Sequence, residues 1–184
     1  MTLTSPAPAP QTAVDPDAFR ALLRRQASTV TVVTAPGLPP AGFTATSFTS
    51  VSLAPPIVSV CLSRDASTWP TVARARHLAV HLLAENQQHI ARTFATSGID
   101  RFADPTAWQA GPHDVPILNG TLAWLLCRVI DRVIVGDHAV VLAEPLFARH
   151  DGDGVPLLYH DGRYAGLAPA DRPPPPPATA AWSR

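Results

Sequence analysis

The chain has 184 residues, enough for one domain with a sizeable hydrophobic core. Its 14 Lys and Arg residues balance 14 Asp and Glu residues without forming a basic patch, which argues against binding to a nucleic-acid backbone. The apolar runs are too short and too interrupted by polar residues to span a bilayer, and the N-terminus lacks the pattern of a secretory signal. These features predict a cytoplasmic protein that binds neither nucleic acid nor membrane.

The two cysteines give a second indication of the compartment. Cys61 and Cys127 each stand alone inside a predicted strand, not in a CxxC pair or a cluster of metal ligands. Free buried thiols in a reducing cytosol are therefore favoured over a disulfide.

The ends of the chain differ in composition from its centre. Residues 1–14 are rich in Pro, Ala and Thr and predict a disordered tail, and residues 169–184 contain a PPPPP run that predicts a stiff polyproline tail. The domain is expected over residues 15–168. Asp15 followed by Pro16 predicts the start of a helix that runs to about Arg25. Alternation and β-branched residues over Ser28–Ala35 predict the first strand.

The stretch Gly42–Leu62 (GFTATSFTSVSLAPPIVSVCL) concentrates small hydroxyl residues between apolar ones. Phe43 and Ala45 share one strand face, whereas Phe48 falls out of step, so a bend is expected near Thr46–Phe48. A bend rich in hydroxyl and backbone N–H groups suits a phosphate or the polar edge of a ring. The alternative is that these Ser and Thr residues simply cover a half-exposed strand.

The remaining segments alternate between strands and short helices. Two long strands are expected to meet at Gly136-Asp137, and a long functional loop is expected between Ser97 and Pro116. Asn86 is the expected N-cap of a helix. Many strands with only three helices predict an antiparallel barrel. The other elements expected in this part of the chain are a return strand over residues 57–63, a helix over 68–76, a strand over 77–84, long strands over 121–135 and 138–149, and a final hairpin that turns at Asp161-Gly162.

One long segment resembles a known family. TATSFTSVSLAPPIVSVCLSRDAST resembles the flavin-binding signature of the short-chain flavin reductases, the small partners of two-component flavin monooxygenases. Further matches in the same order are DRFA, PILNGTLAWLLCRV, VGDHAVVLAEP and PLLYHDGRYAGL, so that the resemblance covers about residues 17–167.

The resemblance implies a fold and an activity. The fold would be mainly β, an FMN-binding antiparallel split barrel with a few short flanking helices, usually as a homodimer. The activity would be NAD(P)H:flavin oxidoreduction, in which hydride passes from NADH or NADPH to FMN or FAD and reduced flavin leaves for a partner monooxygenase. Because the two cofactors supply the redox chemistry, no nucleophile, triad or metal cluster is required.

The family pattern also assigns residues to the flavin. Arg101 could bind the phosphate, and the competing interpretation is a solvated cation on a loop. For Phe102 the competing interpretation is packing in the core. By this pattern the ring edge, ribityl chain and phosphate would contact Thr44, Ala45, Thr46, Ser47, Phe48, Ser50, Val51, Ser63, Asp65, Ala66, Ser67, Thr68, Arg101 and Phe102.

The nicotinamide side is assigned in the same way. The histidine of the GDH triplet, His138, is the leading catalytic candidate, with the role of positioning NAD(P)H; in most proteins such a histidine would be an ordinary surface residue. Tyr159 and Tyr164 resemble residues bordering the nicotinamide, or are barrel aromatics. His77 and His81 are expected on one strand, where they would not converge on a metal, so no metal site is predicted.

The chain also departs from the family pattern. Where relatives show Phe-Pro-Thr/Ser-Gly-Val, it has Gln26-Ala27-Ser28-Thr29-Val30, which changes a turn that approaches the flavin, and Ala143 stands where glycine is frequent. Two alternatives to the reductase therefore stay open: a flavin-binding module for electron transfer or assembly without its own turnover, and a split-barrel flavoenzyme acting on another organic substrate.

Overall fold

The computed structural model describes residues 14–150 and 154–167. The predicted tails lie outside the described residues, apart from Val14. Within the described ranges, no helix is both long and apolar enough to cross a membrane.

The centre of the molecule is a seven-stranded sheet in which every neighbouring pair is antiparallel. The β-branched and alternating residues predicted to form strands do so, which confirms the mainly β, antiparallel architecture. In sheet order the strands are β3 (Ala41–Ala45), β2 (Thr31–Ala35), β6 (His77–Leu82), β9 (Ala123–Val135), β10 (His138–His150), β5 (Pro56–Ser63) and β4 (Thr49–Leu53).

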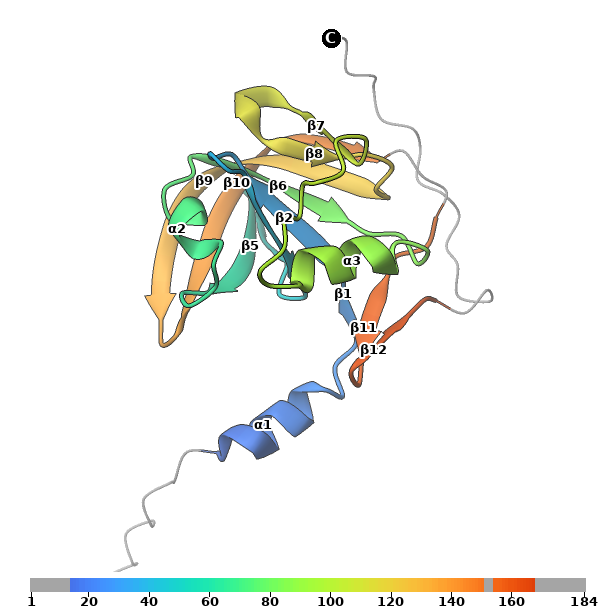
Figure 1. Cartoon of the computed structure of the whole chain (residues 1–184). Coiled ribbons are helices and arrows are strands. Elements are labelled where there is room, and N and C mark those ends of the chain that lie inside the picture. The colour runs from blue at the N-terminus through green and yellow to red at the C-terminus, as the bar shows by residue number, and fades with distance from the viewer. Residues whose placement is uncertain (1–13, 151–153, 168–184) are drawn as a thin grey trace, which may run out of the picture.

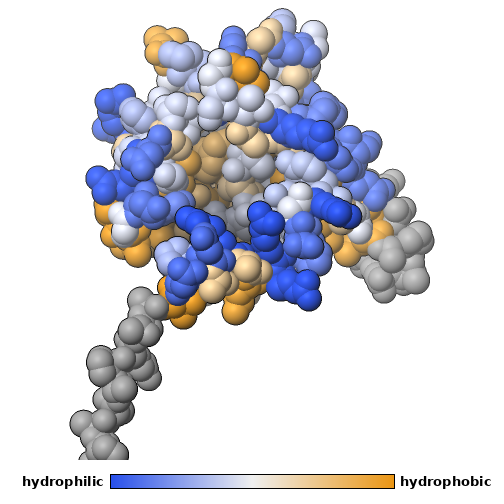
Figure 2. Space-filling model, turned by 60° about the horizontal axis from the view of Figure 1, so that its bottom comes forward, coloured by the Kyte–Doolittle hydropathy of each residue, from blue (hydrophilic) through white to orange (hydrophobic). Residues whose placement is uncertain are grey.

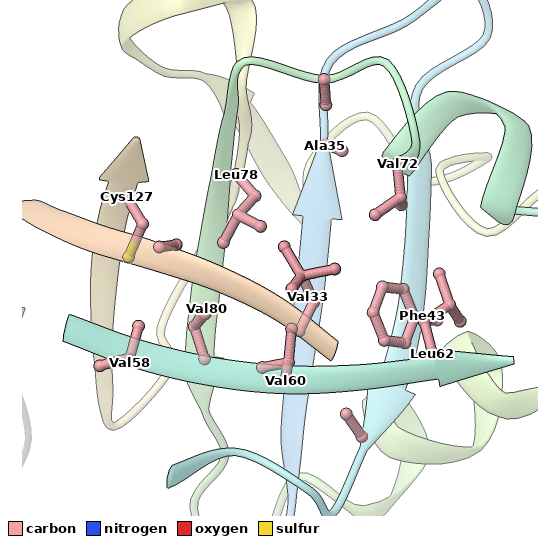
Figure 3. Close-up of a cluster of buried hydrophobic side chains, with 14 residues drawn as sticks. Val33, Ala35, Phe43, Val58, Val60, Leu62, Val72, Leu78, Val80 and Cys127 are labelled. Carbon is pink, nitrogen blue, oxygen red and sulfur yellow. The ribbon is translucent and has the colours of Figure 1, made fainter. Parts of the chain in front are cut away.

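The sheet curls until its two ends face each other across the main hydrophobic core. Figure 3 shows β5 crossing in front of β2 and β3, with Val60 beside Val33 and Leu62 beside Phe43. These side chains are at most 7% exposed. The apolar face of each half thus covers the other, as in a barrel.

The predicted strand Ser28–Ala35 is interrupted. Residues Ser28–Thr29 form β1, which pairs with β11 (Leu158–His160) and not with the barrel, and β11 pairs in turn with β12 (Arg163–Ala165). Val30 lies between the two sheets: its N–H donates to the carbonyl of Leu157 and its carbonyl accepts from the N–H of Leu83. A change of hydrogen-bonding partners at one buried residue therefore divides the strand.

Three helices flank the barrel (Figure 1), as predicted: α1 (Pro16–Leu23), α2 (Trp69–Val72) and α3 (Gln88–Ala95). Asp15 caps α1 by accepting from the N–H groups of Asp17 and Ala18. α1 extends away from the barrel and has no buried residue. The predicted helix over residues 68–76 is shorter in the structure.

The prediction for the start of α3 was wrong. Asn86 lies in an exposed turn, and the cap position is Gln87, whose side chain makes no capping hydrogen bond. Instead the Gln87 amide accepts from the N–H of Ala84 and donates to the carbonyl of Gly120. It connects two loops, a long-range role that local sequence does not reveal.

The segment predicted as a loop from Ser97 to Pro116 contains regular structure. β7 (Trp108–Ala110) pairs with β8 (Pro116–Leu118) through a short 3₁₀ turn at Pro112–Asp114. The apolar residues of β8 are all buried, which explains why this short hairpin holds against the barrel. Residues 97–107 remain irregular and pass beside α3.

Candidate functional site

A cavity of about 400 Å³ lies where β3 begins, beside α2 and the 99–102 loop. We call it the Thr68 cavity. Four residues assigned to the flavin by resemblance, Ser67, Thr68, Arg101 and Phe102, line it together although they are far apart in sequence. The remaining lining residues are Pro39, Pro40, Ala41, Gly42, Thr71, Ile99 and Asp100.

The hydroxyl of Thr68 has an unusual environment. Thr68 is only 7% exposed, and among the described residues its Oγ1 atom has no hydrogen-bond partner. A buried hydroxyl without a partner is unfavourable by roughly 1–3 kcal/mol, so it marks a position where a partner from outside the chain fits.

Arg101 supplies the positive charge of the same cavity. Its Nε and Nη2 atoms donate to the carbonyl of Thr96 (3.0 and 2.8 Å), and its Nη1 atom donates to the carbonyl of Gly42 (3.0 Å). Arg101 is therefore a fixed group and not a freely solvated loop cation. Two of the five N–H groups of a guanidinium have no partner in the described part of the chain and can bind an anion.

Gly42 is required by close packing under the same loop. A Cβ atom at this position would lie 2.5 Å from Cε1 of Phe94 and 3.1 Å from Cζ of Phe102. Phe102 packs edge-on between Phe94 and Trp108, with ring centroids 5.3 and 5.4 Å away. Phe102 thus does both things considered for it, packing against the second core cluster and lining the cavity.

The bend after β3 lies at Thr46–Phe48, as predicted. Its hydroxyl groups are not all available to a ligand. Ser47 Oγ accepts from the N–H of Cys61 (2.9 Å) and donates to its carbonyl (3.3 Å), which ties the bend to β5 and closes the barrel at this point. Thr44 Oγ1 donates to the carbonyl of Ala91 in α3 (2.6 Å).

The other bend residues divide between core and surface. Ala45 and Phe48 pack in the main core, whereas Thr46 and Ser50 are exposed. Val51 is exposed and coincides with a register shift between β4 and β5, so that it faces no partner residue in the ladder. Its backbone is therefore free of the regular pairing that occupies a strand residue.

A second cavity, of about 290 Å³, adjoins the bend. It brings Thr46 together with Tyr159 and with Gln26 and Ser28, so the segment that departs from the family pattern does border the predicted ring site. Sequence reasoning missed the contribution of α1, whose Arg20, Leu23 and Arg24 complete this cavity together with Asp161 and Gly162.

The two cavities lie at opposite ends of β3. Gly42 belongs to the first and Thr46 to the second, and a strand of this length spans about 13 Å. Figure 2, which views the molecule from the end near α1, shows a hollow with weakly hydrophobic walls and a hydrophilic rim.

The turn after β5 brings His138 close to other predicted residues. His138 pairs in register with Ser63, and the N–H of Arg64 donates to the carbonyl of Asp137. Ser63 Oγ accepts from the N–H of Asp65, and Ala66 packs against the main core. The GD turn begins β10 at His138, and the antiparallel pairing of β10 with β5 places that residue beside Ser63.

His138 itself is exposed and oriented by its neighbour. Its Nδ1 atom lies 2.8 Å from Oδ1 of Asp137, and the hydrogen bond to His138 lowers the pKa of that carboxyl group. An ionised Asp137 favours the tautomer with a proton on Nδ1, which leaves Nε2 available to a ligand.

Tyr159 and Tyr164 contact each other, with ring centroids 5.4 Å apart. Tyr164 also packs against the second core cluster, and the Arg92 guanidinium lies 5.8 Å from its ring. Burial raises the pKa of Tyr164, and the nearby Tyr159 adds to this effect. Tyr159 lines the second cavity together with Thr46, a predicted flavin residue. Tyr164 instead packs against the core.

Three other histidines, His77, His81 and His113, contact other parts of the fold. His81 is fully buried: its Nδ1 lies 3.1 Å from the carbonyl of Val32, and its Nε2 accepts from the N–H of Leu118. His77 stacks on His113 with ring centroids 3.7 Å apart. Over residues 14–150 and 154–167 no cluster of three potential ligands could hold a metal. Both cysteines are free thiols, and burial raises the pKa of Cys127 to about 12.

Comparison with known proteins matches almost the whole of the described domain. The family model described as "flavin reductase like domain" matches residues 23–168. An NADH:FMN oxidoreductase of Rhodococcus qingshengii is 44% identical over 151 residues, which is 79% of either chain. The reductase component of a 4-nitrophenol 4-monooxygenase/4-nitrocatechol 2-monooxygenase of Rhodococcus opacus is 39% identical over 160 residues, 85% of this chain and 83% of the relative.

A solved structure agrees with these sequence matches. The NADH:FAD oxidoreductase of Streptomyces globisporus, in complex with NAD and FAD fragments, superposes with a TM-score of 0.80 at 34% identity and covers 88% of this chain and 99% of the other. The curled antiparallel sheet described above is therefore a flavin reductase split barrel, and the chain belongs to the flavin reductase-like domain family.

Proposed function

We propose that the chain is an NAD(P)H:flavin oxidoreductase that transfers hydride from a reduced nicotinamide to FMN or FAD. The reduced flavin then leaves for a partner monooxygenase, so that flavin is a substrate as much as a bound group. The named relatives, an NADH:FMN oxidoreductase and a monooxygenase reductase component, support this activity.

The single observation that carries the proposal is the environment of Thr68. A buried hydroxyl without a partner and a guanidinium with unused N–H groups line the same cavity of about 400 Å³. Together they fit a phosphate ester, which accepts hydrogen bonds from both. A flavin phosphate placed here would direct the rest of the flavin along β3 toward the bend.

Flavin and nicotinamide, when bound, supply the hydride chemistry, and the chain supplies binding and orientation. The unpaired backbone at Val51 and the exposed Thr46 would meet the edge of the ring. Phe48 and Ala66 pack against the main core and would offer an apolar surface to a bound flavin.

His138 has the role of positioning the nicotinamide. It lies beside the Ser63–Asp65 turn, is held by Asp137, and presents Nε2 to solvent and ligand. An imidazole held in this way can form a hydrogen bond with the nicotinamide without being required for proton transfer.

We also propose that the protein is a cytoplasmic homodimer. Val133 of β9, which is 44% exposed, lies opposite Val140 of β10, and Val51 and Leu53 of the edge strand β4 are 54% and 86% exposed. Exposed apolar side chains on a sheet are favourable only when a partner covers them. Two free thiols agree with a reducing compartment.

The test combines flavin binding with nicotinamide oxidation. The purified chain is titrated with riboflavin, FMN and FAD, and NADH and NADPH oxidation is followed with each flavin. We expect His138→Ala to raise the nicotinamide KM more than it lowers kcat, while His160→Ala, at another exposed histidine, changes neither. Flavin binding without oxidation of either nicotinamide would favour the electron-transfer module, and no flavin binding would refute the proposal.

A further inference from the structure

A further cavity, of about 460 Å³, lies on the other side of the loop that carries Arg101. α3 and the loop between residues 100 and 107 form its walls, and the end of β8 closes it. Asp100 and Arg101 line both this cavity and the Thr68 cavity, so one short segment separates the two. No flavin residue predicted from the sequence other than Arg101 lines it.

The floor of this cavity is apolar. Phe94 and Leu118 are each 4% exposed and belong to the second core cluster, and Ile90 packs against the same cluster. Side chains held in a core present a fixed surface, which suits a flat aromatic group such as a purine.

The rim carries carboxylates with spare acceptor capacity. Asp104 Oδ1 accepts from the N–H and the hydroxyl of Thr106, and Asp100 Oδ1 accepts from the N–H of Phe102. Asp100 has a second oxygen with no hydrogen bond to the described residues. The hydrogen bonds from Thr106 lower the pKa of Asp104, so it is ionised at neutral pH. A carboxylate is the group that binds ribose hydroxyls in many dinucleotide sites.

The walls are held in place before any ligand binds. Arg101 is anchored to Thr96 and Gly42, and Trp108 Nε1 donates to the carbonyl of Phe102 (3.1 Å). Asn119 Nδ2 donates to the carbonyl of Thr106 (3.0 Å), which fixes the far end of the loop. Little ordering would accompany binding, which favours affinity.

We propose that this cavity binds the adenosine end of a dinucleotide, with the purine over Phe94 and Leu118 and the ribose hydroxyls at Asp100 and Asp104. This inference rests on the proposed function. When FAD is the dinucleotide, its pyrophosphate lies at Arg101 between the two cavities, and the chain is selective for FAD over FMN. The adenosine of NADH has the same chemistry and is the other source.

The carboxylates predict which adenosine derivatives are rejected. A 2′-phosphate on the ribose would lie near Asp100 and Asp104 and be repelled by both. ADP is therefore expected to bind in isothermal titration calorimetry, and adenosine 2′,5′-diphosphate to bind at least about tenfold more weakly.

A filled cavity separates the two sources. Thr93 lines the cavity from α3, so Thr93→Phe places a ring inside it, and Ala95→Phe adds the same ring to an exposed position of the same helix as the control. Ala103→Phe fills the cavity from the loop and serves if Thr93→Phe does not fold, as judged by circular dichroism. The readouts are the Kd values of ADP, FMN and FAD and the KM of NADH with FMN as acceptor.

We expect Thr93→Phe to weaken ADP and FAD at least about tenfold while FMN changes less than about twofold. A rise in the NADH KM with an unchanged ratio of FAD to FMN affinity would also support the adenosine site and would identify NADH as its source. Unchanged ADP, FAD and NADH values in both filled variants, with FMN still bound, would overturn the inference and leave the reductase proposal intact. Absence of FMN binding by the wild type would instead refute the reductase proposal.

Discussion

The hydroxyl groups of the bend and those of the turn before α2 are used in different ways. Ser47, in the bend, forms hydrogen bonds with Cys61 and so joins the bend to β5. Thr44, just before the bend, donates to the carbonyl of Ala91 and joins β3 to α3. Thr68, which is more buried than either, has no partner in the described chain and lines a cavity. The density of Ser and Thr residues in the sequence therefore indicates where the barrel closes, whereas the unsatisfied hydroxyl indicates where a ligand fits.

His81 extends the comparison, because it is a fully buried polar side chain with a hydrogen-bond partner at each ring nitrogen. Its titration gives the largest effect that we predict. Burial lowers the pKa of His81 to about 4, against about 6.5 in the unfolded chain. The unfolded state binds the additional proton between these values, so stability is complete above pH 6.5 and is lost as the pH falls toward 4, by about 3 kcal/mol. Urea unfolding at pH 7, 5 and 4 measures this loss.

The matched control for this prediction is His81→Gln. It keeps a donor and an acceptor but removes the titrating group, so its stability at pH 7 is lower and its loss between pH 7 and 4 is smaller than that of the wild type. An equal acid-induced loss in both proteins would show that other groups govern the acid transition.

Substitution of Arg101 should have the next largest effect, because this side chain both holds the loop and lines the Thr68 cavity. Arg101→Ala removes three hydrogen bonds and the only cation among the residues that line the Thr68 cavity. We expect the Kd of FMN to rise about 100-fold, measured by fluorescence titration. Arg101→Lys keeps the charge and should recover part of the loss.

Riboflavin, which lacks the phosphate, provides the control ligand for Arg101. Its affinity should change by less than about threefold in Arg101→Ala, since the charged contact is absent in both proteins. If riboflavin and FMN weaken equally, Arg101 acts only by holding the loop.

Thr68→Val separates a ligand contact from a structural one. The substitution replaces an unsatisfied hydroxyl by a methyl group of similar shape, so the free energy of unfolding without flavin should stay the same or rise slightly. The Kd of FMN should rise about tenfold, because the phosphate loses a donor. A large loss of stability with unchanged FMN affinity would contradict the assignment of this cavity.

The sequence predicted the strands and the bend well because alternation, β-branched residues and turn residues act locally. It also indicated Thr68 and Arg101 through family resemblance. It missed the division of the first strand at Val30 and the role of Gln87, because both depend on partners distant in sequence, Leu157 and Gly120. No local signal distinguishes Ser47, whose oxygen is satisfied by Cys61, from Thr68, whose oxygen is not.

Ser47→Ala gives the smallest effect and the opposite pattern to Thr68→Val. It leaves the N–H of Cys61 without its partner at the closure of the barrel, so the free energy of unfolding should fall by about 1–2 kcal/mol. FMN affinity should change by less than about threefold, because the Ser47 hydroxyl already has two protein partners in the absence of flavin. A tenfold loss of FMN affinity at constant stability would show that the hydroxyl exchanges Cys61 for the flavin, and the two regions would then use their hydroxyl groups alike.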